Sequence, residues 1–244
     1  MNGSAPVPAP VPQPAVPFVP APAAPGAVPT PATPSPSKGL VVVTEGLTRT
    51  YNGVNAVDGL NLSVPAGGIY GFLGPNGAGK STTMKLLLGL TRPTSGSMSV
   101  LGRPVSQRHP LPPGTIGSFI EGPSYYPSLT GKENLAMVAS YLGLASNRVQ
   151  HALATVNLIG QENKQVKHYS MGMKQRLGLA MALLSNPALM LLDEPTNGLD
   201  PAGVAEIRQL IVTLARQEGV TIIVSSHILS EIEQMADTVG IICA

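Results

Sequence analysis

The 244-residue chain carries 15 Lys and Arg residues against 13 Asp and Glu residues, so its formal net charge is +2. A charge this small, without an arginine-rich stripe, argues against a nucleic-acid-binding surface. The single cysteine, Cys243, excludes an internal disulfide and fits a reducing compartment.

The first 38 residues differ in composition from the rest of the chain. Residues 1–37 hold 13 of the 25 prolines and carry no charged side chain. Proline lacks the backbone N–H that helices and central strands require, so we expect residues 1–38 to form a disordered Pro/Ala-rich tail. The segment lacks the basic region and apolar core of a secretion signal. A flexible extension is the simpler interpretation, and partner docking is the alternative.

Residues 39–244 are numerous enough for one domain with a sizeable core. No apolar run after Lys38 reaches the ~20 residues of a membrane span, so we expect the chain to be soluble by itself. The first part of this region is rich in Val and Thr, with glycine turns between the apolar runs. The predicted strands cover residues 40–51, 54–64, 69–73, 98–101 and 115–121, and the first two are joined at Asn52-Gly53.

Helical periodicity begins near residue 130. Thr130 and Glu133 form a capping box, and apolar residues follow at helical spacing up to Gly143. Two further helices are predicted, one ending near Gly160 and one beginning at Ser170. We expect this helical insert to span about residues 122–170.

The remainder alternates strands and helices, which is typical of a parallel sheet with right-handed crossovers. The predicted order is strand 188–192, a helix from Asp200-Pro201 to Gly219, strand 220–224, a short helix and strand 238–242. Ligands bind outside the carboxyl ends of such strands. Gly74, Asp193 and His227 are therefore expected to lie together.

A glycine-rich loop follows the predicted buried strand at residues 69–73. It reads Gly74-Pro75-Asn76-Gly77-Ala78-Gly79-Lys80-Ser81-Thr82, which fits the Gly-x-x-x-x-Gly-Lys-Ser/Thr pattern. Small residues let backbone N–H groups surround a polyphosphate, and the following helix adds its positive end. Lys80 would contact the β- and γ-phosphates, and the Ser81 hydroxyl would bind Mg²⁺. The sequence therefore predicts a nucleotide site.

Two acids, Asp193 and Glu194, follow the apolar strand at residues 188–192. In ATP hydrolysis one acid holds Mg²⁺, directly or through water, and another orients or deprotonates the attacking water. We assign Asp193 to the metal and Glu194 to the water. A solvated strand end is the alternative for an acidic pair in isolation, but the phosphate loop upstream favours the catalytic interpretation.

Together these motifs resemble the nucleotide-binding subunit of an ATP-binding cassette (ABC) transporter, over residues 40–244. The resemblance implies an α/β fold, with a P-loop NTPase (RecA-like) core, an N-terminal antiparallel β subdomain and an α-helical insert. The loop at residues 74–82 matches the Walker A motif, and residues 189–194 match the Walker B strand with its catalytic Glu194. The other matches are Tyr51 as the aromatic that stacks on adenine, residues 169–176 as the signature segment, residues 197–200 as the D-loop, and His227 as the switch histidine.

Several of these residues imply a partner subunit. Ser170 would cap its helix and Gly172 would allow close backbone approach, which makes this helix start a second anion site. In the family it serves the ATP held by another subunit, so two chains pair head-to-tail, with Asp200 in the D-loop. His227 would donate to the γ-phosphate. A simple cap is the alternative for Ser170, and packing is the alternative for Tyr51.

Two features depart from the usual family pattern. Most members have glutamine where this chain has Glu121, the implied Mg²⁺ ligand that relays to the membrane subunit. Glutamate there resembles the subset that exports, or confers immunity to, lantibiotics and bacitracin-like peptides. A carboxylate binds Mg²⁺ more strongly than an amide but repels phosphate when the metal is absent. Members usually continue past the strand at residues 238–242, so we expect the chain to lack the usual C-terminal end.

The resemblance therefore implies an ATPase subunit that uses ATP and Mg²⁺ to power a separate transmembrane permease at the cytoplasmic face of the plasma membrane. A peptide antibiotic or related amphiphile is the expected exported substrate. The implied partners are a second ATPase subunit and permease subunits, and no nucleic acid. A non-transport ABC ATPase and a truncated nucleotide-binding regulatory protein are the alternatives.

Overall fold

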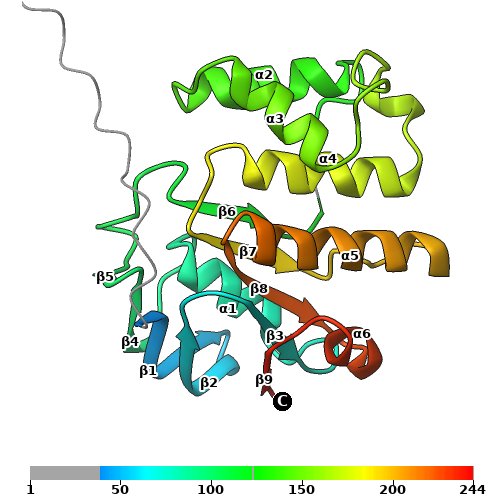
Figure 1. The fold of residues 1–244 in the computed structure, drawn as a ribbon. Helices are drawn as coiled ribbons and strands as arrows, with labels where there is room; N and C mark the ends of the chain where they lie inside the picture. Colours follow the sequence, from blue (N-terminus) through cyan, green and yellow to red (C-terminus); the bar gives the residue numbers. More distant parts are fainter. Residues whose placement is uncertain (1–38, 123, 244) are drawn as a thin grey trace, which may run out of the picture. The chain divides into compact units, whose positions relative to one another are not determined.

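The computed structural model describes residues 39–122 and 124–243, which form an antiparallel sheet, a parallel sheet and the helices around them (Figure 1). The predicted tail, residues 1–38, lies outside the described residues. The strands are β1 (Leu40–Tyr51), β2 (Val54–Pro65), β3 (Ile69–Leu73), β4 (Ser95–Val100), β5 (Arg103–Pro104), β6 (Ile116–Phe119), β7 (Leu189–Asp193), β8 (Thr221–Ser226) and β9 (Thr238–Ile241). The helices are α1 (Lys80–Leu87), α2 (Gly131–Tyr141), α3 (Asn147–Thr155), α4 (Met171–Leu183), α5 (Pro201–Gln217) and α6 (Leu229–Glu233), with a 3₁₀ turn at Val166–His168.

The antiparallel sheet has the strand order β2-β1-β4-β5. Tyr51 pairs with Val54 across the β1–β2 turn, which confirms the predicted hairpin. Asn52 and Gly53 both adopt positive φ angles, 49° and 81°, as a two-residue hairpin turn requires.

The parallel sheet has the order β6-β7-β8-β3-β9. Leu73 is in register with Ser226, and Asp193 is in register with Ser225. The carboxyl ends of β3, β7 and β8 therefore meet at one edge, as predicted. The loop after β3 and the acids after β7 are brought together there.

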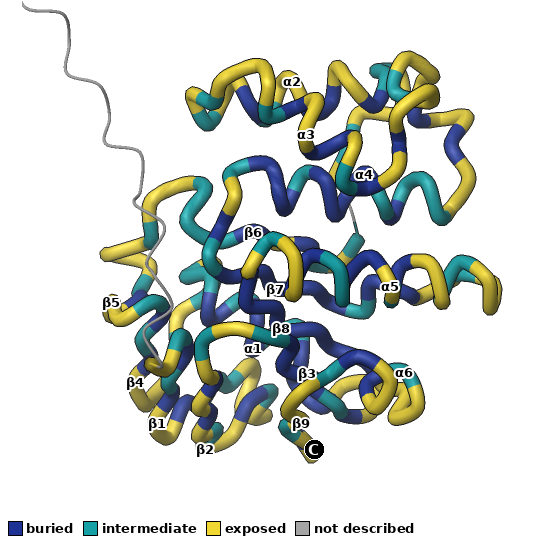
Figure 2. Tube along the Cα trace, in the orientation of Figure 1, coloured by how far each residue is buried: buried dark blue, intermediate teal, exposed yellow. Residues whose placement is uncertain are grey.

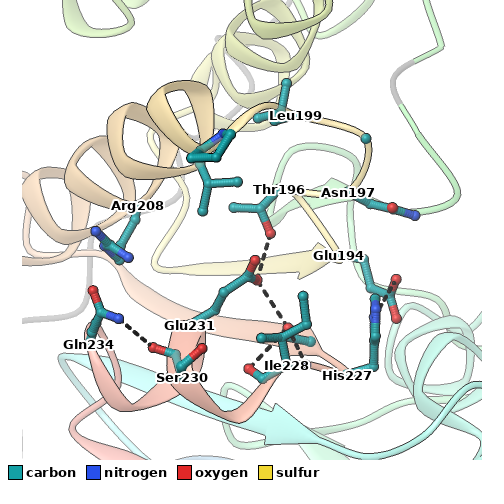
Figure 3. A pocket seen from close by; sticks show the side chains of 14 residues that line it. Glu194, Thr196, Asn197, Leu199, Arg208, His227, Ile228, Ser230, Glu231 and Gln234 are labelled. Carbon is teal, nitrogen blue, oxygen red and sulfur yellow. Dashed lines mark hydrogen bonds and ion pairs between the residues drawn. The ribbon is translucent and has the colours of Figure 1, made fainter.

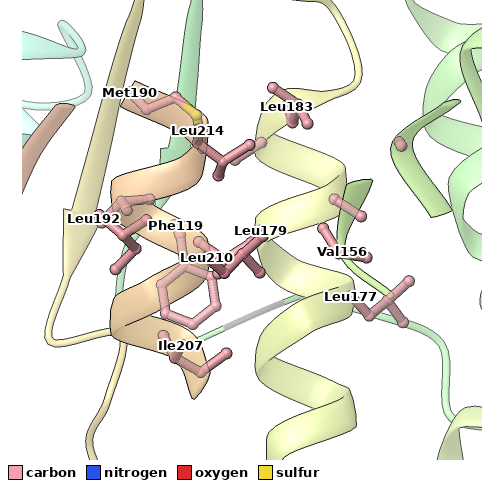
Figure 4. Close-up of a cluster of buried hydrophobic side chains, with 14 of the residues drawn as sticks. Phe119, Val156, Leu177, Leu179, Leu183, Met190, Leu192, Ile207, Leu210 and Leu214 are labelled. Atoms are coloured by element: carbon pink, nitrogen blue, oxygen red, sulfur yellow. The ribbon is translucent and has the colours of Figure 1, made fainter. Parts of the chain in front are cut away.

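Strand β7, which lies between β6 and β8, is buried on both of its faces. Met190 and Leu192 pack in a cluster with α4 and α5 (Figure 4). Leu189 and Leu191 pack on the other face, with α1 and the antiparallel sheet. This alternation follows from the two-residue period of a strand. It explains why β7 reads as an unbroken apolar run, which is typical of a parallel sheet covered on both sides. Figure 2 shows the same contrast between buried strands and outer helices that carry exposed positions.

Local signals define most helix ends. The predicted capping box is confirmed, because Glu133 N donates to Thr130 Oγ1 at 3.1 Å and Thr130 N donates to the Glu133 carboxylate at 2.8 Å. The backbone hydrogen bond from Thr130 lowers the pKa of Glu133. The helix expected to reach Gly160 instead ends at Thr155, since Asn157 turns into the left-handed region at φ 56°.

No helix among residues 39–122 and 124–243 combines the length and apolar character that a membrane span needs.

Helix α4 approaches β6 closely enough that only glycine fits at position 117. A Cβ at Gly117 would lie 2.2 Å from the Ala182 carbonyl oxygen and 3.0 Å from the Pro187 ring. We expect Gly117→Ala to lower the free energy of unfolding by about 1–3 kcal/mol, as overpacking does. Urea denaturation measures this, and Ser118→Ala, an exposed neighbour, should change it by less than about 0.5 kcal/mol. Equal stabilities for the two variants would contradict the close approach.

Candidate functional site

The loop between β3 and α1 depends on glycine at two buried positions. A Cβ at Gly79 would lie 2.1 Å from the Ala56 carbonyl oxygen, and one at Gly74 would lie 2.6 Å from the Ile242 carbonyl oxygen. Gly79 also has φ 94°, in the left-handed region that favours glycine. The β1–β2 hairpin and the end of β9 therefore pack directly against the loop backbone.

The two ends of this loop differ in exposure. Pro75, Asn76 and Gly77 form an exposed tip, and Ala78 and Gly79 are buried. Gly77 adopts φ 86°, and a Cβ there would meet nothing within 4 Å. Position 77 thus needs glycine for its backbone conformation, not because a side chain would clash there. This fits a loop whose N–H groups must turn toward one anion.

Lys80 is 5% exposed, and its ammonium group has oxygen atoms on several sides. It donates to the carbonyl oxygens of Gly74 at 2.8 Å and Pro75 at 3.1 Å. It also lies 3.2 Å from Glu194 Oε1. A buried ammonium requires such pairing, because an isolated charge is costly to remove from water. The structure therefore joins the predicted phosphate-binding lysine to the predicted water-activating glutamate.

Asp193 is held by two hydroxyl groups, one on each carboxylate oxygen. Ser81 Oγ donates to Oδ2 at 2.6 Å, and Ser225 Oγ donates to Oδ1 at 2.6 Å. Ser225 also accepts from Glu194 N at 3.0 Å. We did not predict this role for Ser225, although its position at the end of a strand beside His227 was a usable signal. The neighbouring helix residue Thr82 is half-buried.

The donor chemistry beside Ser81 suits Mg²⁺. This ion prefers oxygen ligands and is commonly bound by one or two carboxylates, with phosphates and water completing its coordination. The touching Ser81 hydroxyl and Asp193 carboxylate supply that kind of oxygen pair at the edge of the phosphate loop.

Glu194 connects the lysine to the histidine. Its Oε2 atom lies 3.2 Å from His227 Nδ1, while Oε1 faces Lys80. The Glu194 backbone has φ 46°, which is uncommon for a residue with a side chain and clusters at functional sites. The structure thus brings the three predicted catalytic residues into one continuous set of contacts.

Tyr51 lies at the end of β1 with 42% of its surface exposed. The Arg49 guanidinium carbon sits 4.2 Å from the centre of its ring, and its hydroxyl is 3.3 Å from Thr91 Oγ1. Hydrogen bonding with Thr91, and then with Arg49, lowers the pKa of the Tyr51 phenol. An adenine stacked on Tyr51 would have to use the ring face opposite Arg49, a residue that we did not predict.

Ser170, Gly172 and Asp200 lie at helix starts. Ser170 accepts from Met173 N at 3.3 Å, and Asp200 accepts from Gly203 N at 3.1 Å. Both predicted caps are confirmed as contacts within their own helices, and among the described residues no hydrogen bond links either to the phosphate loop. A Cβ at Gly172 would meet nothing within 4 Å. Packing within the described part of the chain therefore does not require glycine at position 172.

Glu121 lies beyond the end of β6, which stops at Phe119. The strand predicted to continue to Glu121 ends early because Glu121 and Gly122 both have positive φ, 57° and 89°. The Glu121 side chain is 64% exposed and pairs with Lys85 Nζ at 2.5 Å. We did not predict this pairing, and the metal role of Glu121 stays a prediction.

A hollow of about 430 Å³ opens beside Glu194 and His227 (Figure 3). It lies between the segment after β7 and the segment that leads from β8 into α6. Arg208 and Gln234 lie on the other side of the view from the Glu194–His227 pair. Glu231, which we did not predict to belong to the site, is also part of its lining.

Comparison with known sequences gives consistent matches. A family model described as ABC transporter matches residues 57–197. The uncharacterized ABC transporter ATP-binding protein YcbN of Bacillus subtilis (strain 168) and the bacitracin transport ATP-binding protein BcrA of Bacillus licheniformis are each 49% identical over 203 residues. Those matches cover 83% of this chain but only 66% of each relative, so the chain spans less than two thirds of their length. The lantibiotic transport ATP-binding protein SrtF of Streptococcus pyogenes is 44% identical, over 81% of this chain and 85% of that protein.

Solved structures agree with the fold. The chain of cbiO1 from Clostridium perfringens, described as part of the ABC transporter complex cbiONQ, superimposes with a TM-score of 0.75 at 28% identity, covering 84% of this chain and 85% of that one. The cassette MJ0796, solved as a dimer bound to ADP and Pi, matches with a TM-score of 0.72 at 24% identity, covering 82% and 94%. The second likeness concerns the fold alone.

Two variants of the Lys85–Glu121 pair are expected to change the affinity for metal-free ATP in opposite directions. We expect Glu121→Gln to bind metal-free ATP about two- to fivefold more tightly, because it removes a negative charge and the pair is exposed. Lys85→Gln should bind metal-free ATP more weakly than the unaltered chain, since Glu121 then loses its counter-charge. Calorimetric titration in EDTA measures both affinities, and equal values for Glu121→Gln and the unaltered chain would contradict the prediction.

Proposed function

Since this chain belongs to the ABC transporter family, we propose that it binds ATP with Mg²⁺ and hydrolyses it to power a separate membrane permease. One observation carries the proposal. The Glu194 carboxylate lies 3.2 Å from both Lys80 Nζ and His227 Nδ1, directly after the acid that contacts Ser81. This arrangement supports the proposal, because one γ-phosphate could contact the phosphate-loop lysine, the proposed metal-binding pair and the proposed base together.

The geometry supports a simple sequence of contacts. Phosphate oxygens would take the place of Glu194 around the Lys80 ammonium, and the loop N–H groups would surround the β-phosphate. Ser81 and Asp193 would hold Mg²⁺, and the ion would supply charge neutralisation at the phosphate. Glu194, released from Lys80, would accept a proton from the water that attacks the γ-phosphorus as the bond to the bridging oxygen breaks. His227, which contacts the Glu194 oxygen that does not face Lys80, would donate a hydrogen bond to the γ-phosphate.

The proposed site needs a second copy of the chain or a related subunit. Among residues 39–122 and 124–243, the side-chain hydrogen bonds of Ser170 and Asp200 stay at their own helix starts. The expected roles of these helix starts toward nucleotide would therefore be exerted on another subunit's ATP. The open space at Gly172 supports this, because a glycine that its own fold does not require fits a close approach from outside. Two chains would pair head-to-tail and enclose two nucleotides.

The proposed transport partner is a permease for peptide antibiotics. Relatives at 44–49% identity are named for bacitracin and lantibiotic transport, and this chain carries Glu121 where the glutamine is usual. The region between β6 and α3 exposes large apolar side chains that a membrane partner could cover, namely Tyr126, Met137 and Tyr141. The subunit would work at the cytoplasmic face of the plasma membrane.

Steady-state phosphate release tests the proposed activity. We expect Glu194→Gln to lower the rate about 10²- to 10⁴-fold, because the base is removed while the phosphate contacts stay. Glu45→Gln, the same change at an exposed strand position, should leave the rate unaltered. ATP binding without any phosphate release from the unaltered chain would contradict the enzyme and favour a binding-only regulatory protein.

A further inference from the structure

The hollow beside the Glu194–His227 pair contains a carboxylate that the proposed reaction does not use. Glu231 lies in α6 and is half-buried. Its Oε2 atom accepts a hydrogen bond from Thr196 Oγ1 at 2.8 Å and another from Ser226 Oγ at 3.1 Å (Figure 3). The two donors are buried, with 6% and 3% of their surfaces exposed. One carboxylate oxygen therefore joins two segments that are far apart in the sequence.

Each of these segments carries a proposed catalytic side chain. Thr196 follows Glu194 by two residues, and Ser226 immediately precedes His227. Ser226 Oγ also accepts from Ile228 N at 3.0 Å, which fixes the turn around the histidine. Glu231 thus ties together the backbones on both sides of the 3.2 Å contact between Glu194 and His227.

The energetic role of this link follows mainly from the burial of its two donors and to a smaller extent from the charge of its acceptor. Hydrogen bonds to an ionised carboxylate are stronger than neutral ones, and leaving buried hydroxyls without an acceptor costs more than the bonds themselves are worth. Without Glu231, the Thr196 hydroxyl would lose this acceptor, and the Ser226 hydroxyl would keep only its longer contact with the Ile228 carbonyl oxygen at 3.4 Å. Neither contact would then join the two segments. A misplacement of about 1 Å at a reacting group can reduce a rate about 100-fold.

We propose that Glu231 is a positioning residue. By accepting hydrogen bonds from the Thr196 and Ser226 hydroxyls, it holds Glu194 and His227 at a fixed position relative to each other. The inference rests on the proposed ATP hydrolysis, and Glu231 acts through Thr196 and Ser226 rather than on the nucleotide. Its essential property is an acceptor oxygen within hydrogen-bond distance of both hydroxyls. Its charge is secondary.

Kinetic measurements on three variants test this role. Glu231→Ala should lower kcat about tenfold to a hundredfold with KM unchanged, because nucleotide contacts stay while the attack geometry loosens. Glu231→Gln should restore most of the rate, since its amide oxygen can still accept both bonds. Glu233→Ala removes an exposed carboxylate from the same helix and should match the unaltered chain. A Glu231→Ala variant with normal kcat, or a Glu231→Gln variant as slow as Glu231→Ala, would overturn the proposal.

Hydrogen–deuterium exchange gives a second readout that does not need turnover. Glu231→Ala should increase exchange in residues 194–199 and 225–229 together, whereas Glu231→Gln should leave both protected. Unaltered exchange in Glu231→Ala would refute the link whatever the kinetics. If the unaltered chain releases no phosphate, the proposed function fails, and the exchange data still decide whether Glu231 joins the two segments.

Discussion

A buried ammonium group at Lys80 sets the conditions that the rest of the site must meet. The group lies beneath the loop, so its charge must be balanced by oxygen atoms nearby. Here those atoms come from the loop carbonyls of Gly74 and Pro75 and from Glu194. A polyphosphate would offer a stronger set of oxygen partners and would release the glutamate. The contact between Lys80 and Glu194 thus keeps the proposed base beside the position that the γ-phosphate would take.

The parallel sheet makes this contact possible. Strands β3, β7 and β8 end at the same edge, so Lys80, Asp193 and His227 converge although they are far apart in the sequence. Burial of β7 on both faces fixes its register, because a shift of one residue would turn Met190 and Leu192 toward the wrong layer. Ser225 and Glu231 then connect the strand ends through side-chain oxygens. The sheet brings the site residues to one edge, and the hydrogen bonds of Ser225 and Glu231 fix their positions relative to one another.

The sequence was most informative where a single local rule decides the structure. The Asn52-Gly53 hairpin, the capping box at Thr130 and the apolar run of β7 each have such a rule, and all were predicted correctly. Pairings between distant residues could not be read in the same way. Neither the Lys85–Glu121 ion pair nor the bonds from Thr196 and Ser226 to Glu231 has a sequence spacing that signals it. The early end of β6 depended on the left-handed backbone of Glu121, which glutamate rarely adopts.

The most direct test is the mass in solution of the Glu194→Gln chain, in which we expect slow hydrolysis and a persistent closed state. We predict a dimer with ATP and Mg²⁺ and a monomer with ADP. Adding Gly172→Ala should prevent the dimer without loss of stability, because a Cβ there would have no described atom of its own chain within 4 Å. A chain that stays monomeric at saturating ATP would contradict a nucleotide site completed by a second subunit.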